Sequence, residues 1–261
     1  MELLQQLFPL IEKGLGPLAI VFGVFARVSG LVFLLPGLAE RAVSVRIRLV
    51  AAMAITLILT PVVMSTPPIP PHTPAGLALM LAAELVAGAV IGFSIRIAIF
   101  VVEIAGHIAA QHLSLSQLFA NGLNDAPEPP IATLFMVAGI AVAVAAGIHF
   151  KAVAALAVSY EVMAFGVFPG ADEAGSWAAD QTGYAIAAAF SLAMPFVMLG
   201  FIYYLAIGAA NRAMPQLMVA FVGAPAVTLA GLVMLAMTTP LLLGIWIDMV
   251  DRIFATLLRA G

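Results

Sequence analysis

The sequence predicts an all-α membrane protein that enters or crosses the bilayer several times. Of its 261 residues, 64% are hydrophobic and 9% are charged, whereas soluble domains contain about 25% charged residues. Apolar runs recur along the chain, and several reach the roughly 20 residues that a helix needs to cross the hydrocarbon core. None of them shows the alternating pattern of barrel strands, so their backbone hydrogen bonds must be made within helices.

The apolar runs set the order of the predicted helices. They cover residues 16–36, 49–64, 75–105, 131–168, 184–210 and 217–247. Proline removes a backbone hydrogen bond inside a helix, and Pro195, Pro225 and Pro240 lie within the last two runs. We therefore expect kinked apolar helices and hairpins, organised as a single domain over residues 1–261.

Charge and motif content argue against several classes of protein. There is no cysteine and the net charge is -3, so we expect no disulfide framework, no thiolate chemistry and no nucleic-acid partner. The sequence lacks the G-x-S-x-G, Walker and H-E-x-x-H signatures of enzymes. His107 and His112 are five positions apart and face opposite sides of a helix, which does not favour a shared metal site. We expect no enzymatic activity, cofactor or metal.

A stripe of polar side chains begins inside the third apolar run and continues beyond its end. Its members are spaced 7, 4, 4 and 3 residues apart, which places them on one face of a continuous helix: Arg96, Glu103, His107, Gln111 and Ser114. Because a charge that faces lipid costs several kcal/mol, the stripe predicts a wet lumen or a protein partner. The alternative is that Arg96 and Glu103 pair with each other while the remaining residues cap the end of the helix.

Two further charges stand alone in apolar runs. Arg27 has no acidic residue near it in the sequence, and Glu84 lies about a third of a turn away from the polar stripe. Intramembrane charges of this kind usually have a partner, and we expect it to lie on another subunit. Gly88 and Gly92 form a small-xxx-small pair that suits close helix contact, although both are also ordinary residues in a glycine-rich chain.

Several stretches of this sequence are similar to one protein family. They are Arg27-Val28-Ser29-Gly30 near the start, Glu84-Leu85-Val86-Ala87-Gly88 in the third run, and a segment from Arg212 through Pro215 and Gln216 to Gly223 and Pro225. In this order they resemble the FliR family of flagellar biosynthesis proteins, whose relatives in injectisomes are called SctT. The resemblance covers nearly the whole chain, and the segment that contains Arg212, Pro215 and Gln216 is its most specific part.

The resemblance implies the R-type subunit of the type III protein-export gate, located at the flagellar basal body in the bacterial cytoplasmic membrane. Its implied partners are P-type and Q-type export-gate subunits, the B-type switch subunit and exported unfolded proteins. The resemblance also implies that the helices pack on neighbouring subunits in a helical assembly. An injectisome export-gate subunit, a small-solute transporter and a purely structural scaffold are the alternatives.

In the family, the loop after the third apolar run projects into the pore as a plug. Leu115, Leu118 and Phe119 correspond to part of this loop and share one surface at helical spacing. Apolar side chains can close a pore by dewetting it, so we expect these three residues to belong to the plug. This chain departs from the family pattern over residues 113–130. The alternative is that the three side chains pack the loop onto its own subunit.

Overall fold

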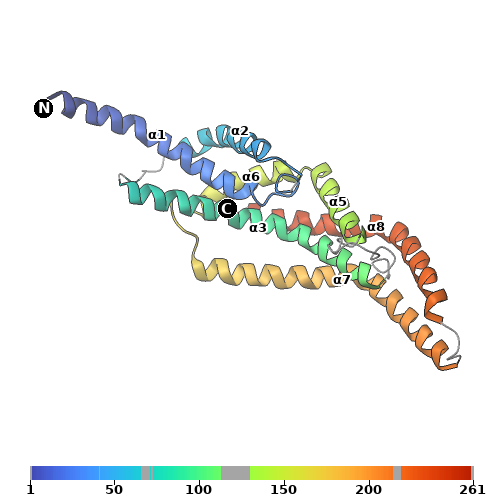
Figure 1. Ribbon diagram of the computed structural model, residues 1–261. Coiled ribbons are helices and arrows are strands. Elements are labelled where there is room, and N and C mark those ends of the chain that lie inside the picture. Colours follow the sequence, from blue (N-terminus) through green and yellow to red (C-terminus); the bar gives the residue numbers. More distant parts are fainter. Residues whose placement is uncertain are drawn as a thin grey trace. The chain divides into compact units, whose positions relative to one another are not determined.

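The computed structural model of the chain describes residues 2–40, 42–65, 71, 73–112, 130–213 and 219–259, and most of these residues lie in helices. These ranges contain no β-strand, and the prediction of an all-α protein is confirmed. In chain order the helices (Figure 1) are α1 (Glu2–Val32), α2 (Val45–Met64), α3 (Pro74–His112), α5 (Pro130–Ala145), α6 (Ile148–Val162), α7 (Ala171–Ala213) and α8 (Val219–Arg259).

Four of the described helices are long and apolar enough to cross a membrane. They are α2, α3, and the parts of α7 and α8 that span Ala174–Ala213 and Pro225–Ala255. The apolar helices α5 and α6 meet at a bend, and together they could form a fifth, broken span. The bend contains Gly147 with φ of 75°, a left-handed conformation that glycine adopts without a steric penalty. The prediction of a polytopic membrane protein is confirmed.

Prolines bend the two longest helices without ending them. Helix α7 continues past Pro195 for its full 43 residues, and α8 contains both Pro225 and Pro240 within its 41 residues. Each proline leaves one backbone carbonyl without its usual intrahelical donor. Both helices change direction along their length (Figure 1), as the sequence predicts for apolar runs interrupted by proline.

The chain divides into two compact units. The first contains Met1–Arg96, Gly147–Ala179 and Asp251–Gly261, and the second contains Ile97–Ala146 and Asp180–Val250. The first unit therefore holds α1, α2, α6 and the first part of α3, with α2 lying against α1 (Figure 1). That the whole chain acts as a single domain stays a prediction.

Close contact between α1 and α3 forms the centre of the first unit. A Cβ atom added to Gly88 would lie 1.8 Å from the carbonyl oxygen of Arg27, and one added to Gly30 would lie 2.3 Å from that of Leu85. A side chain at either position would therefore push the two backbones apart. Gly92 is packed closely as well, because a Cβ atom added to it would lie 2.8 Å from the Cβ of Leu34. The prediction of close helix contact at Gly88 and Gly92 is confirmed.

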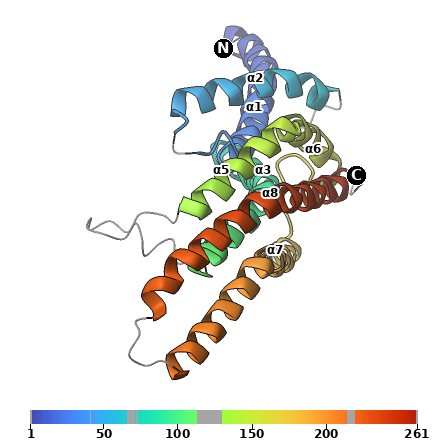
Figure 2. The same ribbon diagram turned by 90° about the vertical axis from the view of Figure 1, so that its right-hand side faces the viewer.

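Aromatic and small residues fill the second unit. Phe135 of α5 meets Phe196 of α7 edge to face, with 6.2 Å between ring centroids. The indole Nε1 of Trp246 in α8 donates a 2.7 Å hydrogen bond to the carbonyl oxygen of Ala98 in α3, and Trp246 is fully buried. A tryptophan N–H in an apolar interior needs such an acceptor. Figure 2 shows the adjoining parts of α7 and α8 running side by side.

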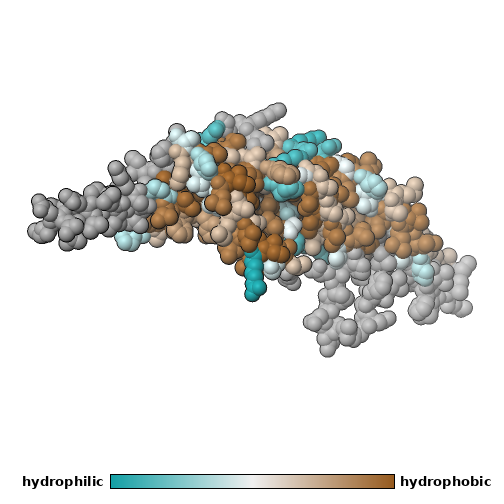
Figure 3. Space-filling model, turned by 90° about the horizontal axis from the view of Figure 1, so that it is seen from above, coloured by the Kyte–Doolittle hydropathy of each residue, from teal (hydrophilic) through white to brown (hydrophobic). Residues whose placement is uncertain are grey.

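Large apolar side chains also cover much of the outer surface. Figure 3 shows apolar residues over most of the visible face of the described chain. On α7 and α8 the exposed set includes Tyr184, Ile186, Phe190, Met198, Phe201, Ile202, Leu205, Leu229, Val233, Met237, Leu241 and Ile245. Exposed apolar surface on this scale requires lipid or a protein partner to cover it.

Candidate functional site

A fully buried ion pair joins α1 to α3. The guanidinium of Arg27 donates through Nε to Glu84 Oε2 at 2.8 Å and through Nη2 to Glu84 Oε1 at 2.9 Å. Both side chains are 0% exposed. The two parallel hydrogen bonds make this a bidentate pair, the strongest geometry for arginine and carboxylate. The expectation that Arg27 and Glu84 find partners on another subunit is wrong, because each is the partner of the other.

The same guanidinium also binds α6 and the turn that follows it. Its Nη1 donates to Ser159 Oγ at 3.1 Å, and its Nη2 donates to the carbonyl oxygen of Met163 at 3.1 Å. The Tyr160 ring lies under the guanidinium carbon at 3.9 Å from its centroid, in the arrangement of a cation–π contact. Arg27 thus links α1 to α6, although 132 residues separate Arg27 from Ser159 in the sequence.

Glu84 receives a third hydrogen bond from the backbone. The N–H of Gly166 donates to Glu84 Oε1 at 2.7 Å. Gly166 has φ of 76°, a left-handed conformation that a side chain would disfavour and that turns the chain after α6. The carboxylate therefore has donors for both of its oxygens, which a buried charge requires to offset the loss of water.

Over residues 101–112, the polar stripe of α3 lies on a face that is less buried than the opposite face. Glu103 and His107 are half-buried and Gln111 is exposed, whereas their neighbours toward the other face, including Ala105 and Ala109, are buried. That this face meets a wet lumen or a protein partner stays a prediction. Ser114 lies outside the described residues.

Arg96, at the start of this stripe, forms an ion pair that the sequence did not reveal. Its Nη1 donates to Glu40 Oε1 at 2.6 Å, and both side chains are about one-fifth exposed (18% and 21%). Arg48 of α2 donates through Nη2 to the carbonyl oxygens of Ala39 and Glu40, at 3.2 and 2.6 Å. Two arginines therefore fix Glu40 in the turn after α1, one at its carboxylate and one at its backbone.

The remaining predicted residues are only partly covered by the structure. Arg212 and Pro225 are exposed, and Gly223 packs on α7, where an added Cβ would lie 2.6 Å from Ile207 Cδ1 and 2.9 Å from the Tyr203 hydroxyl. Pro215, Gln216 and the plug residues Leu115, Leu118 and Phe119 lie outside the described residues. Within the described part of the chain, no group of three or more His, Asp or Glu side chains could hold a metal ion.

These features define a polytopic helical membrane protein with a charged, hydrogen-bonded interior and a polar stripe on a partly exposed helix face. A family model described as "Bacterial export proteins, family 1" matches residues 18–253. The chain therefore belongs to this family of bacterial export proteins, and its resemblance to the FliR family is confirmed.

Three relatives share the name flagellar biosynthetic protein FliR. The protein of Caulobacter vibrioides is 30% identical over 228 residues, which cover 86% of this chain and 90% of the relative. That of Pectobacterium carotovorum is 25% identical, with 85% and 84% covered, and that of Escherichia coli K12 is 26% identical, with 88% of each covered. The similarity extends over nearly the full length of each relative.

The buried pair gives a first prediction. Arg27→Met leaves a carboxylate without its partner, and Glu84→Gln leaves a guanidinium without its partner, so each should destabilise the protein by about 3–5 kcal/mol. The double variant Arg27→Met/Glu84→Gln buries neither charge. Its loss of unfolding free energy should therefore be smaller than the sum of the two single losses, by about 2 kcal/mol. The measurement is thermal unfolding of the protein solubilised with its partner subunits.

The exposed ion pair between Lys151 of α6 and Asp251 of α8 provides a control. Exposed pairs contribute about 0–1 kcal/mol, so Lys151→Met should change the midpoint of unfolding little. Strictly additive effects of Arg27→Met and Glu84→Gln would contradict the coupling inferred from the geometry.

The polar stripe gives a second prediction, helped by the absence of cysteine from the chain. Single cysteines at Glu103, His107 and Gln111 should react with a water-soluble, membrane-impermeant maleimide in membranes that contain the assembled complex, because a polar face directed at lipid would be strongly disfavoured. A cysteine at the buried Ala109 is the control and should react slowly. Reaction of the three stripe positions with lipid-soluble reagents alone would show that the stripe faces acyl chains.

Proposed function

We infer that this chain is the R-type subunit of the flagellar type III protein-export gate in the bacterial inner membrane. The observation that carries the inference is the family match over residues 18–253, together with relatives named for flagellar biosynthesis along most of their length. The helical, apolar fold supplies the membrane location. These findings do not favour an injectisome subunit or a small-solute transporter.

Assembly with other export-gate components follows from the surface of the chain. The apolar side chains along α7 and α8 are too numerous for a stable isolated domain in water. The long helices also carry more apolar length than one bilayer crossing needs. We propose that P-type and Q-type subunits and the B-type switch subunit cover part of this surface, and that unfolded export substrates pass through the resulting pore.

In this proposal, the polar stripe of α3 faces the pore or a partner subunit. Glu103, His107 and Gln111 would line a wet passage, since polar groups beside water lose little of their hydration. The ion pair between Arg96 and Glu40 ties the first residue of the stripe to the turn after α1. The chain itself would supply shape and closure, and no catalytic chemistry.

Closure is assigned to the segment directly after α3. Leu115, Leu118 and Phe119 are large apolar side chains at helical spacing, and an apolar constriction blocks ions by excluding water. Such a closure parts without breaking strong bonds, so an unfolded chain could still pass. The Arg212, Pro215 and Gln216 segment is proposed to serve the assembly as part of the connection between α7 and α8.

The export function gives a third prediction. Deletion of the gene for this chain should abolish secretion of flagellar filament protein and the formation of flagella, because the gate would lack one of its subunits. Expression of the intact chain from a plasmid should restore both, as measured by immunoblotting of culture supernatants and by swimming motility. Normal flagella in the deletion strain, with loss of secretion through an injectisome, would contradict the flagellar assignment.

The plug gives a fourth prediction. Replacement of Leu115, Leu118 and Phe119 by serine should make the assembled gate leaky to small ions, because serine does not dewet a constriction. The measurement is membrane conductance in cells that contain the correctly assembled complex. Ser116→Ala/Gln117→Ala, within the same segment, is the matched control and should leave the gate tight. Unchanged conductance in the triple serine variant, with assembly intact, would show that the loop only packs on its own subunit.

A further inference from the structure

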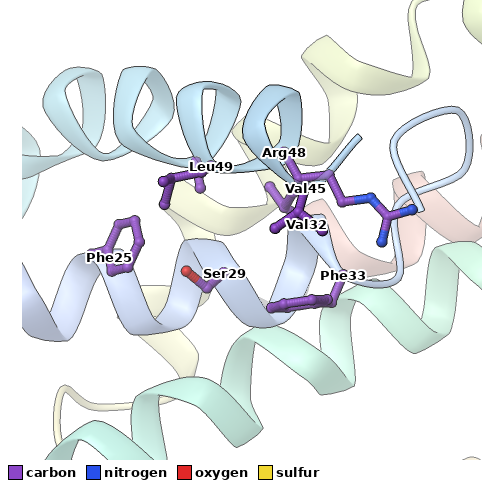
Figure 4. A pocket seen from close by; sticks show the side chains of 8 residues that line it. Phe25, Ser29, Val32, Phe33, Val45, Arg48 and Leu49 are labelled. Carbon is purple, nitrogen blue, oxygen red and sulfur yellow. The ribbon is translucent and has the colours of Figure 1, made fainter. Parts of the chain in front are cut away.

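An apolar slot of about 180 Å³ lies between the end of α1 and the beginning of α2. Figure 4 shows its walls coming from the two helices. Three lining residues come from α1, one from the turn directly after it and four from α2: Phe25, Ser29 and Val32, then Phe33, and Val45, Arg48, Leu49 and Ala52. For comparison, an apolar cavity of about 150 Å³ is large enough to bind benzene, so this slot can hold a segment of hydrocarbon chain.

The slot reaches the outer surface of the first unit. Phe33 and Val45 stand at its rim with 61% and 71% of their surface exposed, and Leu49 is 49% exposed. Helix α2 is also one of the candidate membrane spans. Its 20 residues correspond to about 30 Å, close to the thickness of the hydrocarbon core. The surroundings of the slot therefore suit contact with lipid chains.

Two arginines lie in the first turn of α2, which begins beside one end of the slot. Arg46 is exposed and Arg48 lines the slot, and no acidic residue lies in the first turn of α2. The guanidinium of Arg48 extends toward the turn after α1 (Figure 4). Its Nε is buried and has no hydrogen-bond acceptor among the described residues. The carboxylate of Glu40, the acidic group of that turn, is already paired with Arg96.

The two helices run in opposite directions along the slot, so its two ends differ in character. Phe33 and Val45 mark the end nearest the arginines, and Phe25 and Ala52 mark the apolar end. A ligand that fits must carry a negative group at one end and hydrocarbon at the other. Phospholipids have this order, and basic pockets between membrane helices are known binding sites for anionic head groups.

We propose that this slot binds an anionic membrane phospholipid. The phosphate lies at Arg46 and Arg48, and part of one acyl chain lies between α1 and α2. The bound lipid fills the space that the helices leave open and supplies an acceptor for the guanidinium of Arg48. Helices α1 and α2 would then depend on the composition of the membrane for their full stability.

Native mass spectrometry of the purified export complex tests the proposal, with phosphatidylglycerol and phosphatidylcholine of identical acyl chains as probes. The intact complex should retain phosphatidylglycerol in preference to phosphatidylcholine. Arg46→Gln removes an exposed charge with little effect on folding and should reduce this preference about fivefold, the factor that corresponds to about 1 kcal/mol per basic residue.

Filling the slot tests the acyl-chain site independently of charge. Ala52→Phe on α2 and Ser29→Leu on α1 should each weaken binding of both lipids, whereas Leu57→Phe on the exposed part of α2 should not. Agreement between the two slot variants excludes the misfolding of one of them as the cause. Three outcomes would overturn the proposal. The intact complex could retain the two lipids equally, or it could retain neither because a partner subunit fills the slot. Retention could also be unchanged in both slot variants.

Discussion

The need to pair a charge that water cannot reach governs the first unit of this protein. Arg27 lies on an apolar helix with its side chain fully buried, so its guanidinium needs acceptors inside the protein. Glu84, Ser159 and the carbonyl oxygen of Met163 accept four hydrogen bonds from it. They come from α3, from α6 and from the turn after α6. The position of each of these segments therefore depends on the others, because the loss of one acceptor leaves a charge partly unsatisfied.

The ion pair and the glycine contact depend on each other. Glu84 and Gly88 are four residues apart, so they lie on the same face of α3. Gly88 lets α3 approach the backbone of Arg27, and this short distance lets the guanidinium and the carboxylate meet with both pairs of atoms aligned. A different face of the same helix carries Arg96, Glu103 and Gln111. The face of α3 that carries Glu84 and Gly88 is thus committed to the interior of the first unit.

Much of this architecture could be predicted from sequence, because hydrophobic length and helical periodicity are local properties. The helices, the stripe from Arg96 to Gln111 and the close contact at Gly88 all follow from spacing. The pairing of Arg27 with Glu84 does not, since 57 residues separate them and no local pattern connects them. One signal was present: Arg27 and Glu84 both lie in apolar runs, neither belongs to the polar stripe, and the two have opposite signs. Glu40 gave no such signal, because it lies in a turn where a charge needs no partner. The assignment of Leu115, Leu118 and Phe119 to a plug stays a prediction.

Helix length has a consequence for how cells must produce this protein. Helices α3, α7 and α8 contain 39, 43 and 41 residues, which corresponds to about 60 Å each, roughly twice the thickness of the hydrocarbon core. The bilayer can cover only part of such a helix, and the rest has to be covered by other helices of this chain or by another protein chain. Synthesis of this subunit therefore has to be matched to that of its partners. A copy made in excess would leave apolar helix surface without cover, and exposed apolar surface of this kind favours aggregation.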